Sequence, residues 1–494
     1  MATLAESNCA QNGWNFAASF KHQYLITPHS EPAPGNWPSV ELGKWRVGHC
    51  PNLPVAALTL TDGTVVGLVI GVAVSQGGMI IEGRHKMPVS ARAEDPVALA
   101  EAYISTLAGR YVVLFNYADT ARVYPDPTCS LGPVYHPQSG RVAASTALVL
   151  DRDLRDNPTI PASEVAANRA RYLFGHTADA EVKRAISNHY VDLADFSIHR
   201  HWPTESLEFT LGARDFRDAS DEIATKLGAN VQALSGRFPT ALPISGGTDS
   251  RVLLAASAPH LEQIQQFYAY HVNWSTSVDC EVALGITQAM CLPFQIISRD
   301  STRFQQALTE AGLHDHLARR QLSGGFEPDT ADARIVQAMH LVPENRMILR
   351  GNVIEMTRAP RWHRSVFDDP HNTGFAMEKL GVDANADTGF HASCVASFLD
   401  WKDRLPGNTI PRIYDFLHTE LWMPHTNSAG YIRDLRHFMI NPFNDRHLIH
   451  LTTCIKPIMR KRRRMVNHIL QSRLPEIAAI PYGNDLVAER RKSA

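Results

Sequence analysis

The stretch Leu242-Pro-Ile-Ser-Gly-Gly-Thr-Asp-Ser-Arg251 decides the fold of the second half of the chain. The mostly apolar residues 240–244 before the serine predict a short buried strand, and residues 252–256 predict the start of a helix. A strand that enters a helix through two glycines gathers free backbone N–H groups and the positive end of the helix dipole at one place. The stretch therefore predicts an anion site, which the glycines open to close approach by phosphate oxygens.

The polar residues of this loop suit a nucleotide phosphate. Ser245, Thr248 and Ser250 offer hydroxyl donors, whereas Asp249 would repel a bare phosphate and so indicates a bridging cation such as Mg²⁺. The spacing is neither the GxxxxGK[ST] of a Walker loop nor GxGxxG. The alternative interpretation is a tight turn that only joins a strand to a helix.

Ser245 to Ser250 resembles the SGGxDS pyrophosphate loop of the ATP pyrophosphatase superfamily, and is most similar to that of the synthetase domain of asparagine synthetases. Six matching positions between a strand and a helix favour a nucleotide site over a plain turn. The resemblance implies that ATP and Mg²⁺ bind here, with Asp249 as a catalytic residue and metal ligand. It implies nucleotide-binding roles for Ser245, Gly246, Gly247, Thr248, Asp249 and Ser250.

Composition limits the classes of function. The chain has 494 residues, which predicts two or three domains, and its 44% hydrophobic and 20% charged residues are typical of a globular protein. With a formal net charge of −2, we expect no overall attraction to nucleic acid or to an anionic membrane. No apolar run is long enough to span a bilayer, and the first twenty residues lack the apolar core of a secretory signal. We therefore expect a cytoplasmic protein without nucleic-acid or membrane partners.

Cysteine and histidine are spaced without a metal-binding pattern. The seven cysteines form no CxxC pair, and the 23 histidines show no HExxH spacing. Neither a disulfide framework nor a zinc site is therefore expected.

The first half of the chain is predicted to be rich in strands. Asp62-Gly63 between two apolar runs is a strong hairpin signal. Asp95-Pro96 predicts the beginning of a helix that reaches Leu107. The expected strands are Val55 to Leu60, Thr64 to Val74, Met79 to Ile81, Tyr111 to Phe115 and Ala121 to Tyr124.

Four segments of this half resemble the glutaminase-type Ntn-hydrolase domain at the front of asparagine synthetases: 109–112, 122–135, 142–148 and 200–203. The resemblance implies an α+β domain over residues 1–211. A working glutaminase of this kind carries its nucleophilic Cys at the mature N-terminus. Here Cys9 or Thr3 would serve only after trimming. We therefore expect a degenerate domain without glutaminase activity, and an amine that is already on the substrate.

Strands and helices alternate in the second half, after an amphipathic helix at 215–236 with Ile223, Leu227, Val231 and Leu234 on one face. Such alternation implies a parallel sheet with helices on its faces and ligands at the carboxyl ends of its strands. The resemblance implies an adenine-nucleotide α-hydrolase-like synthetase domain over residues 212–494, and hence an α/β chain of two domains. The expected elements are strands at 240–244, 264–272, 293–298 and 347–350, and helices from Asp249 and over Val278 to Met290.

Three further site residues follow from the family resemblance. The second strand and the helix after it border the adenine and ribose in the family, which implies nucleotide contacts for Tyr268 and Asp279. The alternatives are strand packing for Tyr268 and compensation of the helix dipole for Asp279. Residues 349–355 lie where the family has an acidic SGDGSDE-type motif. Although Asn352 replaces an acid, we expect Glu355 to be a catalytic carboxylate and metal ligand, the alternative being a surface Glu.

The C-terminal region lacks one expected residue. Residues 441–446 resemble the family's R-x-P-F-x-D motif and predict Asp445 as a helix N-cap or salt-bridge partner. The family places a catalytic Lys soon after a Leu-Pro, and no Lys follows Leu474-Pro475 at that spacing. We expect Lys456 or a residue of the basic run 460–464 to replace it, the rest of that run being a solvated helix face.

The resemblance implies ATP-dependent amide-bond formation. A substrate carboxylate attacks the α-phosphorus of ATP and releases pyrophosphate, and an amine then displaces AMP from the acyl-adenylate. Relatives that lack the glutaminase Cys include the lasso-peptide cyclases and the β-lactam synthetases, so the first expectation is macrolactam formation in a lasso-type peptide, with a protein partner that handles the precursor peptide. The alternatives are a small-molecule amide synthetase that takes ammonia or a free amine, and a nucleotide-binding pseudoenzyme that acts as a scaffold in a biosynthetic complex.

Overall fold

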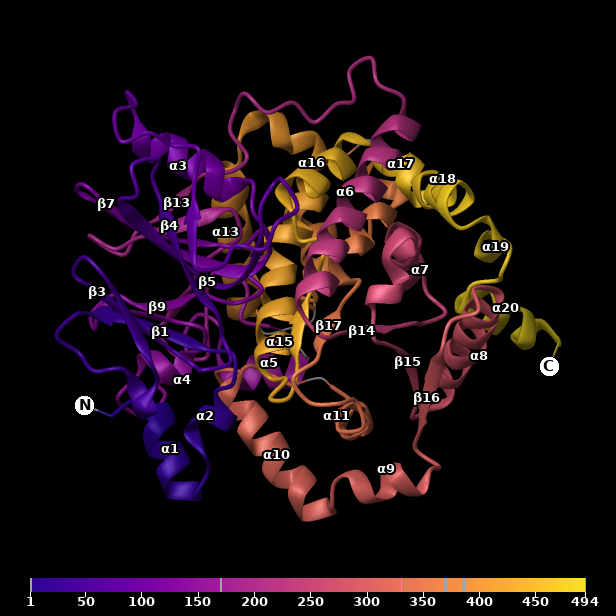
Figure 1. Cartoon of the computed structure of the whole chain (residues 1–494), viewed down its shortest axis with the longest axis horizontal. Coiled ribbons are helices and arrows are strands. Elements are labelled where there is room, and N and C mark those ends of the chain that lie inside the picture. The colour runs from indigo at the N-terminus through magenta and orange to yellow at the C-terminus, as the bar shows by residue number, and fades with distance from the viewer. Residues whose placement is uncertain are drawn as a thin grey trace.

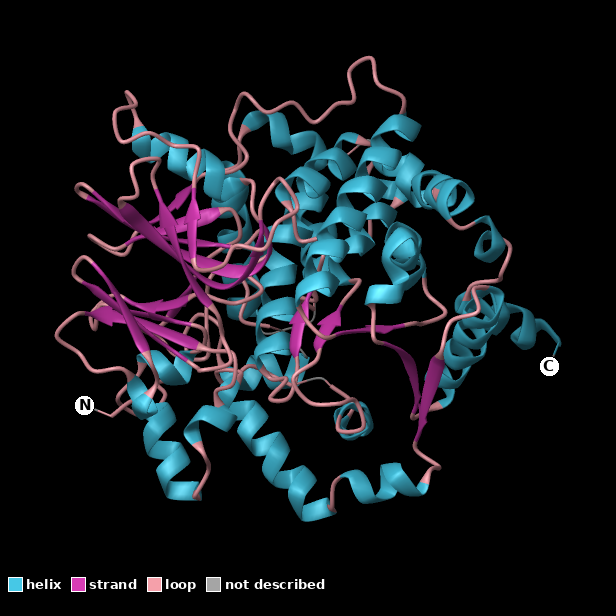
Figure 2. Cartoon of the chain, viewed as in Figure 1, coloured by secondary structure: helices cyan, strands magenta, loops and turns pink. Residues whose placement is uncertain are grey.

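The computed structural model of the chain describes residues 2–168, 171–329, 331–367, 369, 371–383 and 388–493. It is a mixed α/β structure with three sheets. Two sheets lie in the part coloured indigo to magenta, and the third lies among the helices of the second half (Figures 1 and 2).

The first sheet has the strand order β11-β9-β10-β1-β3-β2, and all of its pairs are antiparallel. Its strands are β1 (Tyr24–Pro28), β2 (Ser39–Leu42), β3 (Trp45–His49), β9 (Val134–His136), β10 (Arg141–Ala143) and β11 (Lys183–Arg184). The second sheet has the order β13-β12-β8-β7-β5-β4-β6. Its strands are β4 (Val55–Thr59), β5 (Val65–Val74), β6 (Arg84–Lys86), β7 (Ala108–Tyr117), β8 (Thr120–Pro125), β12 (His189–Asp192) and β13 (Ile198–Arg200).

Local signals account for much of the second sheet. The Asp62-Gly63 turn joins β4 to β5 as predicted, with the Thr64 N–H donating to Asp62 Oδ1 at 3.0 Å and Gly63 at a φ of +92°. Asp95 caps the predicted helix α3 (Pro96–Ser105) by accepting the Ala98 N–H at 2.9 Å. The prediction of a strand at 79–81 is wrong, because within it only Ile80 makes one isolated bridge, to Val74.

The third sheet is parallel throughout, as predicted from the alternation of strands and helices. Its order is β16-β15-β14-β17-β18, so β14, which leads into the glycine loop, is the central strand. The edge strand β18 was not predicted. The strands are β14 (Thr240–Pro243), β15 (Gln266–His271), β16 (Phe294–Ser298), β17 (Met347–Leu349) and β18 (Phe438–Ile440).

Four helices pack around the central strands. The helix α6 (Phe216–Arg237) contacts α7 (Thr248–Ser257), both contact α18 (Arg464–Arg473), and α8 (Trp274–Ala289) packs on β15. The predicted apolar face of α6 is buried, as Ile223, Leu227, Val231 and Leu234 all belong to the largest hydrophobic core. Figure 1 shows these helices together above and beside β14 and β15.

A helical run with two π-helical segments crosses the interior. It consists of α14 (Ile413–Phe416), η6 (Leu417–Trp422), η7 (Pro424–Ala429) and α15 (Gly430–Ile432), and η6 and η7 have π-helical hydrogen bonding. Its buried Glu420 accepts hydrogen bonds from Arg200, Asn188 and Trp401. The run therefore links the first half of the chain to the second through buried polar contacts.

The remaining α-helices lie mainly in the connections. They are α1 (Leu4–Asn12), α2 (Phe16–Ser19), α4 (Thr146–Val149), α5 (Ala162–Asn168), α9 (Thr302–Ala307), α10 (Glu310–Ser323), α11 (Ala333–Met339), α12 (Thr373–Leu380), α13 (Thr388–Asp403), α16 (Arg446–Cys454), α17 (Pro457–Lys461), α19 (Pro475–Ala478) and α20 (Gly483–Ser493). Within the described ranges, no helix combines the length and the apolar composition that crossing a membrane requires. The largest core contains residues from both sides of position 211, and the division into domains 1–211 and 212–494 stays a prediction.

Candidate functional site

The glycine loop lies at the carboxyl end of β14, where it is tied to itself by its own hydroxyl groups. The Ser250 hydroxyl accepts the Ser245 N–H at 3.2 Å, and the two hydroxyl oxygens are 3.1 Å apart. The Gly247 N–H donates to Ser245 Oγ at 3.3 Å. Two of the three hydroxyl residues predicted to bind phosphate therefore also hold the shape of the loop.

Gly246 is closely surrounded, so that a larger residue there would force its neighbours to shift. Its N–H donates to Asp279 Oδ1 at 2.9 Å, and its carbonyl accepts the Gly483 N–H at 3.0 Å. A Cβ on Gly246 would lie 2.9 Å from Asp279 Oδ1 and 3.2 Å from the backbone of Gly483. Asp279 thus contacts the loop through the backbone of Gly246, and its contact with a nucleotide stays a prediction.

The N-terminus of α7 is open. Its N-cap residue is Gly247, and no side chain caps the helix. The first N–H groups of a helix have no partner within the helix, so at α7 they face a ligand or solvent. Beside them lies a polar pocket of about 140 Å³. It is lined by Gly246, Gly247, Thr248, Asp249, Ser275, Val278, Asp279, Arg358, Arg463, Tyr482, Gly483, Asn484 and Val487.

Asp249 is paired with an arginine from another element. Arg358, at the end of η3 (Asn352–Arg358), donates from Nε to Oδ1 at 2.9 Å and from Nη2 to Oδ2 at 2.6 Å. Gly351 allows the approach of this segment, since a Cβ there would lie 3.1 Å from Asp249 Cβ. Burial raises the pKa of Asp249, and Arg358 partly opposes that rise.

Glu355 belongs to a second charged cluster on the same segment. Its Oε1 lies 2.8 Å from Nε2 of His418, and Arg361 Nε donates to His418 Nδ1 at 3.1 Å. Because arginine only donates, Nδ1 of His418 is the acceptor. Its Nε2 therefore carries a proton and donates a hydrogen bond to Glu355. Although burial raises the pKa of Glu355, its hydrogen bond to His418 and the nearby positive charges lower that pKa overall. The charge of Glu355 also acts on Asp249 and raises the pKa of that group.

The basic run contributes both to the pocket and to the core. Arg463 lines the loop pocket and lies over the ring of Tyr482, 4.5 Å from its centroid. Arg460 is fully buried and pairs with Asp415 through two hydrogen bonds of 2.9 and 2.6 Å. One residue of the run therefore faces the loop pocket, and another supports the fold.

Two predicted site residues lie away from the loop pocket. Tyr268 is completely buried, and its hydroxyl donates to Met339 Sδ at 3.7 Å, which is the strand-packing alternative. Lys456 is exposed at the N-cap of α17 and lines another pocket of about 610 Å³ together with Trp362 and Arg412. The structure therefore places Asp279 against the loop, and Glu355 on the segment whose Arg358 binds Asp249. Tyr268 and Lys456 do not line the loop pocket.

Three further residues with predicted roles are Cys9, Thr3 and Asp445. Cys9 is buried inside α1, where burial raises the pKa of its thiol, and Thr3 is the N-cap of that helix. Asp445 caps α16 as predicted, accepting the N–H groups of His447 and Leu448.

Sequence reasoning missed the partners of the acidic residues. Arg358 follows Glu355 by three positions, which in a helical turn brings both to one side, and this spacing was the available signal. No sequence signal pointed to His418, because its contact with Glu355 joins residues 63 positions apart.

The polar groups around the loop suit a bound anion better than a divalent cation. Both oxygens of Asp249 are bound by Arg358, and Oδ1 of Asp279 accepts a backbone N–H. Among the residues that the structure describes, no three His, Cys, Asp or Glu side chains are grouped as metal ligands. The arrangement does not fit a preformed magnesium site, since an ion at Asp249 would have to displace Arg358.

No protein-family model and no curated protein sequence matches this chain. The asparagine synthetase-like assignment therefore stays a prediction that rests on the loop and its surroundings.

Proposed function

We propose that the chain is an ATP-dependent, AMP-forming amide ligase of the asparagine synthetase type. In this proposal residues 1–211 form a degenerate glutaminase-like domain of Ntn type, and residues 212–494 form an adenine-nucleotide α-hydrolase-like synthetase domain. One observation carries the proposal: the uncapped N-terminus of α7 follows a Gly-Gly loop at the end of the central parallel strand and faces Arg358 and Arg463. Backbone N–H groups and arginines together are a strong site for a polyphosphate.

The size of the pocket supports pyrophosphate as the group that is held. A volume of about 140 Å³ is well below the roughly 300–1,000 Å³ of sites that enclose a whole drug-sized ligand. The pocket therefore has room for the β- and γ-phosphates, while the adenosine lies outside it. A contact from Tyr268 to the adenine would require that buried side chain to move.

The chemistry follows from this placement. An oxygen of the substrate carboxylate attacks the α-phosphorus, the bond to the bridging oxygen breaks, and pyrophosphate leaves into the loop. The N–H groups of α7 and the two arginines stabilise its negative charge. The amine then attacks the acyl carbon, a proton leaves the nitrogen, and AMP departs. The proposed acceptor of that proton is Glu355, which is held by His418.

Two classes of substrate are compatible with this chemistry. The first candidate is macrolactam formation in a lasso-type peptide, where the amine is on the substrate and a partner protein handles the precursor. The second is a small-molecule amide synthetase that uses ammonia or a free amine. ATP enters as its Mg²⁺ complex in either case, in the cytoplasm, without nucleic acid or membrane as a partner.

A nucleotide-binding scaffold without turnover is the competing class. The bidentate pair between Arg358 and Asp249 favours it, because that pair blocks the carboxylate that the family uses for metal. The two classes differ in whether ATP is consumed.

Analysis of nucleotide products tests the proposal. The purified protein is incubated with Mg²⁺-ATP and an extract of its native cells, and AMP, ADP and pyrophosphate are separated. We expect AMP with pyrophosphate, and loss of both in Asp249→Ala while the fold is retained. Formation of ADP, or full activity of Asp249→Ala, would contradict the site assignment. Binding of ATP without turnover would favour the scaffold.

A further inference from the structure

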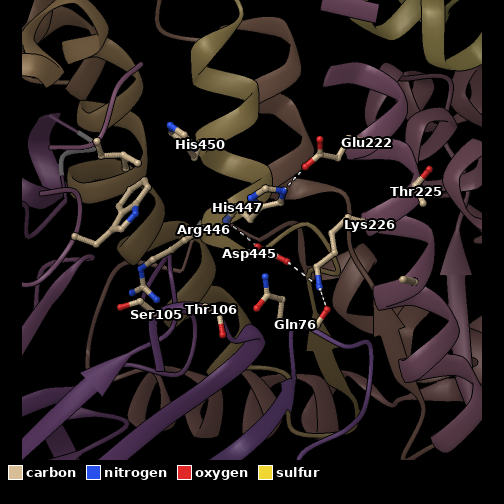
Figure 3. Close-up of a pocket in the computed structure, with 13 residues that line it drawn as sticks. Gln76, Ser105, Thr106, Glu222, Thr225, Lys226, Asp445, Arg446, His447 and His450 are labelled. Carbon is tan, nitrogen blue, oxygen red and sulfur yellow. Dashed lines mark hydrogen bonds and ion pairs between the residues drawn. The ribbon is translucent and has the colours of Figure 1, made fainter. Parts of the chain in front are cut away.

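A larger pocket lies between the first half of the chain and the helices α6 and α16, and it shares no lining residue with the loop pocket (Figure 3). Its volume of about 630 Å³ is in the range of sites that enclose a small molecule. The residues that line it are Gln76, Ser105, Thr106, Trp202, Leu207, Glu222, Thr225, Lys226, Ala229, Asp445, Arg446, His447 and His450.

A buried arginine without a direct ion pair among the described residues lines this pocket. Arg446 is 2% exposed, and its guanidinium donates to Asn188 Oδ1 at 3.2 Å, to the Pro125 carbonyl at 3.2 Å and to His201 Nε2 at 3.4 Å. Its Nη1 has no hydrogen-bond partner, and Arg446 has no ion pair with a carboxylate in the described part of the chain. A buried charge without a counter-ion is costly, so an anion nearby would stabilise this arrangement.

His201 connects Arg446 to Ser105 in the pocket lining through its two ring nitrogens. Because the guanidinium only donates, His201 Nε2 is the acceptor, and the proton lies on Nδ1. Burial, and secondarily the charge of Arg446, hold the pKa of His201 well below its usual value, so the ring is neutral. His201 Nδ1 lies 3.1 Å from Ser105 Oγ and donates to it. The hydroxyl proton of Ser105 is thus left for a ligand.

Lys226 is a second cation in the lining of the pocket. Lys226 Nζ donates to the Gln76 carbonyl at 2.9 Å and lies 3.9 Å from Asp445 Oδ2, which leaves further N–H groups for a ligand. The two acids of the lining already have donors. Asp445 accepts the N–H of His447 at 2.8 Å, and Glu222 is bound by His447 and Arg214. Figure 3 shows Lys226 beside Asp445 and Gln76, and His447 turned toward Glu222.

The remaining wall is apolar, with Trp202, Leu207 and Ala229 along it. We propose that this pocket binds a small organic carboxylate, whose charged end is held by Ser105 and Lys226 and whose apolar body lies against Trp202. The site is independent of the proposed ATP site, so either proposal can fail without the other.

Calorimetric titration with matched acids and amides tests this site. The probes are hexanoate, phenylacetate and 2-naphthoate, each beside its uncharged primary amide, on the full-length protein. We expect at least one acid to bind saturably and about tenfold or more tighter than its amide, because a charge-assisted hydrogen bond is lost in the amide. Lys226→Gln is expected to remove that difference, and Ser105→Ala to reduce it severalfold.

The exposed Lys86 provides the matched control. Lys86→Gln makes the same change of charge on β6, which contributes no residue to the pocket lining, and is expected to leave binding unchanged. Urea unfolding of each variant verifies that its fold is intact. No preference for any acid over its amide, or an equal loss of binding in Lys86→Gln and Lys226→Gln, would overturn the proposal.

Discussion

Gly246 and Gly247 are adjacent and identical, yet their surroundings differ. Gly246 is enclosed by Asp279 and Gly483, whereas a Cβ on Gly247 would meet only Ser245 Oγ, at 3.4 Å. Both have ordinary backbone angles, since neither has a positive φ. The space around each glycine, and not its conformation, therefore decides what a methyl group does.

We expect Gly246→Ala to lower the free energy of unfolding by about 1–3 kcal/mol, because the methyl group forces Asp279 away from the loop. Gly247→Ala, the matched control, is expected to change it by less than about 1 kcal/mol. Urea unfolding of both variants measures this difference. Equal destabilisation would show that Gly246 is not enclosed by Asp279 and Gly483.

The contribution of the Arg358–Asp249 pair to the free energy of unfolding is expected to depend on pH. Removing the arginine in Arg358→Met leaves the half-buried Asp249 without its cation, so the pKa of Asp249 rises further above 3.8. A carboxyl whose folded pKa is raised binds more protons in the native state, and its contribution to stability falls as pH rises. Because both side chains are partly exposed, we expect a loss of about 1–2 kcal/mol at pH 7 and a smaller loss near pH 4.

Urea unfolding between pH 4 and pH 7 measures this dependence. The double variant Asp249→Asn with Arg358→Met serves as the control and is expected to lose the pH dependence, since the titrating group is gone. A loss that is the same at both ends of the pH range would contradict the assigned coupling.

At the scale of elements, short-range signals predicted most of what positions the site. The Asp-Gly hairpin, the Asp95 cap, the apolar stripe of α6 and the strand–loop–helix unit at β14 all depend on neighbours within a few residues. The segment predicted as a strand at 79–81 is short and forms one isolated bridge, although its Ile81 is buried.

The missed elements depend on distant contacts. The strands β1, β2 and β3 lie in a proline-containing region without a clear alternation, and the three-residue β18 is defined by its pairing with β17. The π-helical segments η6 and η7 bury polar residues that find partners only in the folded chain. The contacts of His418 with Glu355 and of Arg358 with Asp249 are also long-range. The loop could therefore be predicted from its neighbours in sequence, whereas these two pairings could not.

Glu420 shows what the π-helical run contributes. Arg200 donates to both of its oxygens, and Asn188 and Trp401 complete its hydrogen bonds. Although burial raises the pKa of Glu420, Arg200 lowers it overall. Such a carboxylate stabilises the fold above pH 4.5, and this stabilisation is lost as pH falls through the lowered folded pKa.

We expect Glu420→Gln to lower the free energy of unfolding by about 3–5 kcal/mol at pH 7, because it leaves Arg200 buried without a counter-ion. The penalty is expected to shrink as the solution is acidified below pH 4.5, and unfolding curves at pH 7 and pH 3 measure it. The exposed Glu476→Gln on α19 is the matched control and is expected to have almost no effect. A penalty that grows toward low pH would contradict the assignment.

At the scale of the whole molecule, buried ion pairs join the two halves of the chain. Arg184 on β11 pairs with Glu327 at 2.7 Å, and both side chains are at most 5% exposed. Arg200 pairs with Glu420 in the same way, and the largest core includes apolar residues from Leu4 to Ile477. Separation of the halves would break these ion pairs and would expose part of that core to water.

We therefore expect the two halves to unfold together. Urea transitions followed by circular dichroism and by tryptophan fluorescence are expected to coincide at pH 7, because separation of one buried pair alone costs about 3–5 kcal/mol. Two separated transitions would show that the halves are energetically independent.

We propose that the Ser245 to Ser250 loop holds the pyrophosphate part of ATP. Calorimetric titration of the full-length protein with Mg²⁺-ATP and with AMP tests it most directly. If the claim holds, ATP binds at least about tenfold more tightly than AMP, since only ATP brings β- and γ-phosphates to α7, Arg358 and Arg463. This difference disappears in Gly246→Ala and persists in Gly247→Ala. Equal affinity for ATP and AMP, or an undiminished preference for ATP in Gly246→Ala, would contradict the claim.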